Sequence, residues 1–302
     1  MKLPSLVGQV AGPCVQTVDA RWLMAYAAAL GDAVPEYLDT TRPDGVLGHP
    51  LFPVCFEWPV ALDFRDRLPG DVAVRSVHAT HDLRVHRRPR PGDRLSTTAS
   101  VVSTEPRSPG AYVVTRFETT DAAGQPVCST DYGSIYLGVD CENASSVEAK
   151  ASRAPDDLPP RARAPREVLQ PDWSAHVSVP ATLAHTYTEC ARIWNPIHTD
   201  IAVARSAGLP DIILHGTATL ALAVSAALGK TGLGPGAEVT RITARFTGMV
   251  PLPSTLSVRG WDDATGEERR IAFEVLGADG RPVIRDGTLL ARGTDGHRAR
   301  AT

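Results

Sequence analysis

The stretch that decides the fold is Tyr187–Gly216, which reads YTECARIWNPIHTDIAVARSAGLPDIILHG. Proline lacks a backbone N–H and disfavours the α region in the residue before it, so Asn195-Pro196 cannot continue a helix. We therefore expect an irregular segment over residues 193–198 that projects His198 from a tight turn. The His215-Gly216 dipeptide then opens the run TATLALAVSAALG, which is small and apolar on every face and predicts a helix buried on most sides.

This stretch resembles the MaoC-like family, the (R)-specific enoyl-thioester hydratases and dehydratases of the hotdog fold. The family pattern runs aromatic, Ser-Gly-Asp, any residue, Asn-Pro, apolar, His, any residue, Asp, and later Pro-Ile-x-His-Gly. The positions that match it are Tyr187, Asn195, Pro196, Ile197, His198, Asp200, Ile213, Leu214, His215 and Gly216. The family's catalytic Asp falls on Ile193 and the Gly before it on Arg192. The resemblance therefore implies the fold, together with a site that lacks its usual carboxylate.

An internal repeat predicts that the chain holds two copies of one domain. Tyr26 aligns with Tyr187 at an offset of 161 residues, and the same offset still pairs Leu95 with Leu256. Beyond that point the offset falls to 156, which predicts a hairpin loop five residues longer in the first copy. The steady register predicts that the two copies superpose and that their sheets join side by side.

Each copy shows helices followed by an antiparallel meander, which indicates an α+β fold. Helices are predicted over residues 19–30, 53–64 and 216–228. Strands are predicted over residues 74–85, 94–102, 112–120, 127–137, 238–246, 255–260, 270–276 and 283–291. With the resemblance, this order predicts a double hotdog, two tandem domains whose antiparallel sheets each wrap around a central helix. The expected limits are 1–140 for the N-terminal hotdog, 141–168 for a linker, 169–293 for the C-terminal MaoC-like hotdog and 294–302 for a disordered tail.

The composition bounds the function classes. The 302 residues are 43% hydrophobic and 22% charged with a formal net charge of −3, which is ordinary for a globular protein and gives no case for nucleic acid. Five scattered cysteines without CxxC spacing indicate free thiols in a reducing cytoplasm and no metal framework. The chain shows neither a signal peptide nor an apolar run long enough for a membrane span. We therefore expect a cytoplasmic protein, a monomer of two hotdogs or a homodimer.

The resemblance assigns the chemistry to the turn and to the helix start. In hydratases of this family an Asp and a His hold one water, which adds to Cβ of an enoyl thioester while a proton goes to Cα. The resemblance makes His198 the proton-transfer group, and Asn195 is expected to place the substrate or the water. Free N–H groups and the helix dipole at His215-Gly216 favour the enolate-like oxygen; a packing role for Gly216 is an equal and compatible alternative.

Three further side chains are candidates for accessory roles. Glu189 lies one helical turn before Ile193, although a solvated helix face is the favoured reading. In the first copy, Asp32 keeps the family's Gly-Asp while Tyr37 stands at the His position. A shared site of Asp32 and His198 is disfavoured, because in double hotdogs of this kind the two equivalent sites lie at opposite ends of the paired helices. There the first copy usually houses the acyl tail.

The run RVHRRPRPGDR, residues 84–94, concentrates positive charge on a predicted strand end and hairpin. Arg84, Arg87, Arg88 and Arg90 are candidates to contact the phosphates of coenzyme A or of carrier-protein phosphopantetheine. A solvated basic loop explains the run equally well. No separate cofactor is expected, because coenzyme A or phosphopantetheine is part of the substrate.

The sequence thus predicts a lyase that acts on acyl-CoA or acyl-carrier-protein thioesters, as an enoyl hydratase or 3-hydroxyacyl dehydratase. Because Ile193 replaces the usual Asp, three alternatives stay open. The first is a rewired lyase, isomerase or cyclase that uses His198 alone. The second is a catalytically silent, thioester-binding partner subunit, and the third is a hotdog thioesterase.

Overall fold

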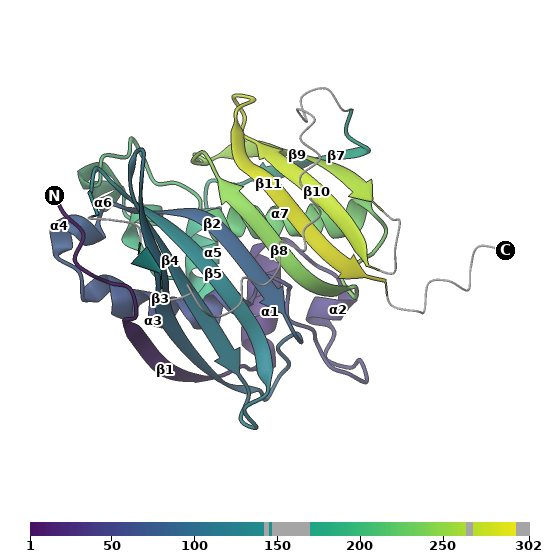
Figure 1. Cartoon of the computed structure of the whole chain (residues 1–302). Helices are drawn as coiled ribbons and strands as arrows, with labels where there is room; N and C mark the ends of the chain where they lie inside the picture. The colour runs from purple at the N-terminus through teal and green to yellow at the C-terminus, as the bar shows by residue number, and fades with distance from the viewer. Residues whose placement is uncertain (142–144, 147–169, 264–267, 294–302) are drawn as a thin grey trace.

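The computed structural model describes residues 1–141, 145–146, 170–263 and 268–293 (Figure 1). Within these residues eleven strands form one sheet, and ten of them follow the order β1-β3-β4-β5-β2-β8-β11-β10-β9-β7. The second half of this order repeats the first half in reverse, strand for strand. The sheet therefore consists of two copies of one five-stranded unit related by a pseudo-twofold axis between β2 and β8. This arrangement is the predicted double hotdog.

The first copy supplies the strands on one side of this axis. Its elements are β1 Val10–Thr17, α1 Ala20–Ala29, α2 Pro35–Leu38, α3 Pro53–Asp66, α4 Gly70–Ala73, β2 Ser76–Val85, β3 Arg94–Arg107, β4 Gly110–Thr120 and β5 Pro126–Leu137. Asp19 caps α1, since its carboxylate accepts from the Trp22 N–H at 2.7 Å. The helix α3 is the central helix of this copy.

The second copy repeats the same order of elements. Its elements are β7 Trp173–Val179, α5 Leu183–Ala191, the 3-10 turn η1 Pro196–His198, α6 Ile201–Ser206, α7 Gly216–Lys230, β8 Glu238–Phe246, β9 Ser254–Asp263, β10 Arg269–Leu276 and β11 Pro282–Arg292. Asp200 caps α6 by accepting from the N–H groups of Ala202 and Val203. Its role is therefore local and structural. The helix α7 is the central helix of the second copy, and nine of its residues are buried.

The two copies share one seam, where β2 pairs antiparallel with β8. Arg241 on β8 donates to both carboxylate oxygens of Asp82 on β2, at 2.9 and 2.6 Å. Beside the sheet, α1 contacts α5, and Figure 1 shows α1, α5 and α7 on the same side of the sheet. Tyr26 on α1 and Tyr187 on α5 are both fully buried in this contact. The sheets of the two copies therefore join side by side, as predicted.

Two expectations from the sequence need correction. The sequence analysis did not predict β1 and β7, the strands at the two edges of the sheet. The predicted longer hairpin loop in the first copy is wrong. Residues 108–109 alone connect β3 to β4, so this hairpin loop cannot be five residues longer than its counterpart. The additional residues of the first copy lengthen the strands, since β3 and β4 have 14 and 11 residues and β9 and β10 have 10 and 8.

Part of the predicted linker over residues 141–168 is described by the structure. Ser145–Ser146 form the short strand β6, which pairs with β3. The remainder of the linker beyond Cys141, and the tail over 294–302, lie outside the described residues. All five cysteines are free. In the described part of the chain, no helix is long and apolar enough to cross a membrane.

Candidate functional site

The turn that carries His198 is built by the end of α5. Arg192 ends this helix in the left-handed conformation at φ 59°, the position where the first copy has Gly31 at φ 77°. The chain then turns through Ile193 into Asn195, from which η1 starts. The Asn195 side chain makes no cap bond to η1. This side chain lines a cavity, where its amide can bind another molecule.

His198 is held in one tautomer. Its Nδ1–H donates to the carbonyl oxygen of Ile213 at 2.8 Å, which leaves Nε2 with the lone pair. The ring stacks on His215, with centroids 3.7 Å apart and an angle of 26° between the planes. Burial lowers the pKa of His198 to about 4, and the Ile213 carbonyl opposes this shift. Burial and the neighbouring His198 also hold the pKa of His215 well below its usual range. Both imidazoles are therefore neutral at pH 7.

The start of α7 presents free backbone donors beside His198. His215 is the N-cap residue and makes no side-chain cap bond, so the first N–H groups of the helix have no capping side chain. Gly216 and Thr217 both line the cavity. A Cβ at Gly216 would lie 3.2 Å from the Phe246 ring, so this glycine also permits close packing. The geometry thus suits both roles that the sequence suggested.

The cavity in front of His198 has a volume of about 90 Å³ and is lined by both copies. Helix α3 of the first copy contributes one face, with lining residues at spacings of three and four along the helix. The lining residues are Val54, Glu57, Trp58, Ala61, His78, Phe117, Tyr132, Ile193, Asn195, His198, His215, Gly216 and Thr217. The first copy therefore forms a wall of aromatic and aliphatic side chains that also holds Glu57 and His78, and the second copy contributes the turn and the helix start.

Glu57 is a site residue that the sequence analysis missed. It is 4% exposed, and the Thr130 hydroxyl donates to its Oε1 at 2.6 Å. Burial raises the pKa of this carboxyl to about 7, with the Thr130 bond opposing the shift. The sequence did contain a signal: Glu57 is the single charged residue in the otherwise apolar run over residues 53–62, PVCFEWPVAL. A buried acid in a helix of this kind points to function more often than an exposed acid does.

The structure places Asp32 and Tyr37 at a different location. Asp32 accepts from the Ser225 hydroxyl at 2.7 Å, and burial raises the pKa of the carboxyl. Tyr37 is 2% exposed and lies 5.8 Å from the His49 ring. Neither lines the cavity of His198, so the structure does not bring Asp32 and His198 together. Glu189 is exposed and accepts from the Trp194 indole N–H at 3.5 Å, also outside this cavity.

Asp32, Ser225 and His49 form a hydrogen-bonded chain, but not one that activates a nucleophile. The Leu51 N–H donates to Nδ1 of His49, so Nε2 carries the proton and donates to Ser225 Oγ at 3.0 Å. A general base must instead accept the serine proton. Burial lowers the pKa of His49 to about 3, so it stays neutral. The arrangement is a satisfied buried network.

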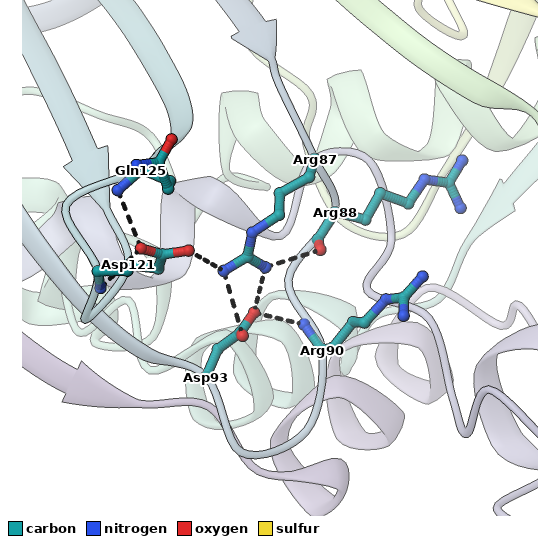
Figure 2. Close-up of polar contacts among 7 residues, drawn as sticks. Arg87, Arg88, Arg90, Asp93, Asp121 and Gln125 are labelled. Carbon is teal, nitrogen blue, oxygen red and sulfur yellow. Dashed lines mark hydrogen bonds and ion pairs between the residues drawn. The ribbon is translucent and has the colours of Figure 1, made fainter.

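The arginine run lies at the far end of β2 (Figure 2). Arg87 is paired with Asp93 at 2.6 Å and with Asp121 at 3.3 Å. The Arg88 guanidinium donates to the carbonyl oxygens of Pro235 at 2.6 Å and Ala237 at 2.5 Å.

Arg84 and Arg90 are exposed. Arg87, Arg88 and Arg90 line a second cavity, whereas His78, near the start of β2, lines the cavity of His198. At about 3.3 Å per residue, the eight steps from His78 to His86 span roughly 25 Å. The run therefore lies well away from His198.

Comparison with known proteins gives the same assignment for both halves. A family model described as "MaoC like domain" matches residues 160–277, and one described as "FAS1-like, dehydratase domain region" matches residues 5–130. The chain is 41% identical over 101 residues to 3-hydroxyacyl-thioester dehydratase Y of Mycobacterium tuberculosis, covering 32% of this chain and 34% of that protein. It is 28% identical over 191 residues to the peroxisomal multifunctional enzyme type 2 of Drosophila melanogaster, covering 63% of this chain and 30% of that enzyme. The chain thus spans about a third of the length of these relatives.

Solved structures share the whole architecture. A MaoC-like dehydratase from Phytophthora capsici superposes with a TM-score of 0.77 at 20% identity, covering 96% of this chain and 97% of that one. A conserved Mycobacterium tuberculosis protein described as having a double hotdog fold superposes with a TM-score of 0.61 at 19% identity, covering 95% and 96%. At these identities the likeness establishes the fold alone.

Two hotdog units in one sheet, with a buried histidine beside an uncapped central helix, define a double-hotdog protein. The two family models then assign residues 5–130 to a FAS1-like dehydratase region and residues 160–277 to the MaoC-like dehydratase family. At the level of the family, this is a group of hydratases and dehydratases that act on acyl thioesters.

Proposed function

We propose that this protein interconverts a 2-enoyl thioester and a 3-hydroxyacyl thioester by adding or removing water. The observation that carries the proposal is the placement of His198, whose tautomer leaves Nε2 free as a base beside the start of α7. The names of the two sequence relatives, a 3-hydroxyacyl-thioester dehydratase and a multifunctional enzyme, are consistent with this chemistry. The protein would then be a hydro-lyase.

In the hydration direction, Nε2 of His198 takes a proton from water as the water oxygen bonds to Cβ. The electron pair of the double bond moves to Cα and toward the thioester carbonyl. Backbone N–H groups of Gly216 and Thr217 would bind the oxygen that becomes enolate-like. The Asn195 amide, which lines the same cavity, would orient the water or the carbonyl.

The substrate would occupy the cavity across the two copies. Phe117 and Tyr132 line it from the sheet of the first copy, which suits an acyl chain. The carrier is coenzyme A or a carrier-protein phosphopantetheine, and as part of the substrate it replaces any separate cofactor. We propose that the protein acts in the cytoplasm, as a monomer of two hotdogs or as a homodimer.

Hydration of crotonyl-CoA by the purified protein tests this function. His198→Ala should lower kcat/KM by about 10²–10⁴-fold, the usual contribution of a positioned acid or base. His176→Ala is the matched control, because His176 is exposed on β7, outside the cavity. Full activity in His198→Ala, or no hydration of any enoyl thioester by the wild type, would overturn the proposal.

Ile193 favours two further candidates, because an isoleucine at 4% exposure cannot exchange protons. One is a silent subunit that binds thioesters without turning them over. The other is a rewired lyase, isomerase or cyclase that uses His198 alone. Calorimetric binding of crotonyl-CoA without hydration would support the silent subunit. Turnover of another activated thioester that depends on His198, without hydration, would support the rewired enzyme.

A further inference from the structure

We propose that Glu57, on the central helix of the first copy, supplies the second proton-transfer group that Ile193 leaves missing in the second copy. This inference rests on the proposed hydration chemistry and names a residue for it. The site would then be a composite, with its imidazole from one hotdog and its carboxyl from the other.

The first support is that Glu57 and His198 face the same small space. Both residues line one cavity of about 90 Å³, so a molecule bound in it would lie against groups from both copies. Glu57 belongs to the face of α3 that also presents Val54, Trp58 and Ala61 to the cavity. Glu57 therefore lies on the side of α3 that borders the cavity.

The second support is that no other carboxyl competes for the role. Glu57 is the single Asp or Glu among the described residues that line this cavity. Asp32 is bonded to Ser225 in a separate network, and Glu189 is exposed beside Trp194. A carboxyl partner for His198 must therefore come from Glu57 or from outside this part of the chain.

The third support is the way in which the carboxyl is held. Thr130 Oγ1 donates to Oε1 at 2.6 Å, and Cys128 Sγ lies 4.0 Å from the same oxygen. Both contacts go to Oε1, so within the described residues Oε2 has no hydrogen-bonding partner. A carboxyl that is held by one oxygen, on a residue that lines a cavity, suits proton exchange with a bound molecule.

The environments of the two groups set complementary charge states. Burial raises the pKa of Glu57 to about 7 and lowers that of His198 to about 4, so at neutral pH a large share of the protein carries a neutral acid beside a neutral base. During hydration, water gives its proton to Nε2 of His198 and its oxygen bonds to Cβ. The carboxylic acid of Glu57 then gives its proton to Cα, which neutralises the enolate.

The cycle balances without any other reactant. Hydration leaves His198 protonated and Glu57 ionised, and transfer of one proton from the imidazolium to the carboxylate, through solvent, restores both. The net reaction is enoyl thioester plus water to 3-hydroxyacyl thioester. In dehydration the same two groups act in the opposite sense.

The test is a set of four proteins assayed on crotonyl-CoA: wild type, Glu57→Gln, Ile193→Asp and the double variant. Glu57→Gln should lower kcat by about 10²–10⁴-fold with KM within about threefold, since the isosteric amide keeps an acceptor for Thr130 but cannot donate an acidic proton. The kcat of the double variant should be at least about tenfold higher than that of Glu57→Gln, because Ile193→Asp returns a carboxyl to the family's position. Asp63→Asn, on an exposed turn of the same helix, is the control and should keep full activity.

The outcomes separate this inference from the proposed function. If His198→Ala loses hydration while Glu57→Gln keeps full kcat, the function stands and the role of Glu57 is wrong. If the wild type hydrates no enoyl thioester, the function fails, and the role of Glu57 with it. Should Ile193→Asp fail to fold, Glu57→Asp replaces the double variant as the rescue. It keeps a carboxyl at the same site and should retain at least about tenfold more activity than Glu57→Gln.

Discussion

The phenol oxygens of Tyr26 and Tyr187 lie 3.3 Å apart, although the residues are separated by 161 positions in sequence. The ring centroids are 5.6 Å apart, and both side chains are fully buried. The Tyr187 hydroxyl donates to Thr217 Oγ1 at 3.1 Å, and Thr217 lines the cavity. The contact between the two copies is therefore linked directly to the first turn of α7, where the proposed anion donors lie.

This tyrosine pair should be energetically coupled. We expect Tyr26→Phe and Tyr187→Phe each to lower the free energy of unfolding by about 1 kcal/mol, the net contribution of a typical intramolecular hydrogen bond. Since both variants remove the shared contact, the double variant should cost less than the sum of the single ones. Urea unfolding of the four proteins measures the coupling. Strictly additive costs would show that the two hydroxyls do not interact in solution.

The pH dependence of kcat/KM should follow the two buried groups. Activity requires neutral His198, so it should fall below about pH 4, and it requires protonated Glu57, so it should fall above about pH 7. Glu57→Gln should remove the alkaline limb and leave the acidic one. Initial hydration rates on crotonyl-CoA between about pH 3 and 9 measure both limbs, with circular dichroism as the control for folding.

The ionisable groups around Glu57 do not titrate between pH 5 and 8. Burial raises the pKa of the Cys55 and Cys128 thiols and of the Tyr132 phenol, and it lowers the pKa of His78 well below its usual range. All four are therefore neutral between pH 5 and 8. If kcat/KM of Glu57→Gln still falls above about pH 7, this fall is caused by the titration of a group other than Glu57.

Glu57 should also make the folded state less stable at alkaline pH. Its pKa is about 7 when folded and 4.5 in the reference state, so the folded protein binds the extra proton. Stability is then fully present below about pH 4.5 and is lost as the pH rises through about 7, by roughly 3–4 kcal/mol at about 1.4 kcal/mol per unit. Glu57→Gln should therefore unfold at higher urea than the wild type at pH 8 and differ little at pH 5. If Glu57→Gln and the wild type differed in urea midpoint by the same amount at pH 5 and pH 8, the raised pKa of Glu57 would be contradicted.

Arg192 occupies a conformation that favours glycine. At φ 59° a side chain costs about 1–2 kcal/mol, and the guanidinium stacks 4.0 Å above the Trp22 ring, a contact worth about 0.5–1 kcal/mol. Arg192→Ala keeps the strain and loses the contact, so it should be the least stable form. Arg192→Gly should be more stable than Arg192→Ala by about 1 kcal/mol, measured by thermal unfolding. Equal stability of the two variants would mean that the backbone relaxes out of this conformation.

Arg88 should stabilise the packing of the two copies and should not contact a phosphate group. Arg88→Ala removes donors to two carbonyl groups of the second copy, which should cost about 1–3 kcal/mol of unfolding free energy. The KM for crotonyl-CoA should change less than twofold. Arg84→Ala, at an exposed position, is the stability control. A tenfold rise in KM with unchanged stability in Arg88→Ala would restore the phosphate role.

The repeat and the turn motif were sufficient to predict the fold and the residues of the second copy that line the candidate site. The steady offset between Tyr26 and Tyr187 predicted two equivalent units, and the paired β2 and β8 confirm that their sheets join. The strand β1 was missed because Gly12 and Pro13 interrupt its alternation. Turn chemistry likewise predicted the projection of His198, since a proline ends a helix whatever surrounds it.

The rest of the site depends on contacts that a local pattern does not encode. Glu57 and His198 line the same cavity because the two copies pack against each other. The local sequence around either residue does not predict this. The same limit applied to the arginine run. Its charge was visible in the sequence, but the carboxylates that pair with Arg87 and the carbonyls that bind Arg88 come from elsewhere in the fold.

The shared seam of β2 and β8 has a consequence for how the site assembles. Where two hotdogs are separate subunits, a site built from both exists only in the associated fraction, which shrinks on dilution. Here residues of both copies belong to one polypeptide, so their encounter is intramolecular and independent of protein concentration. The two units are also free to diverge. One can retain the imidazole and the other can provide the carboxyl, without the identical chains of a homodimer having to carry both.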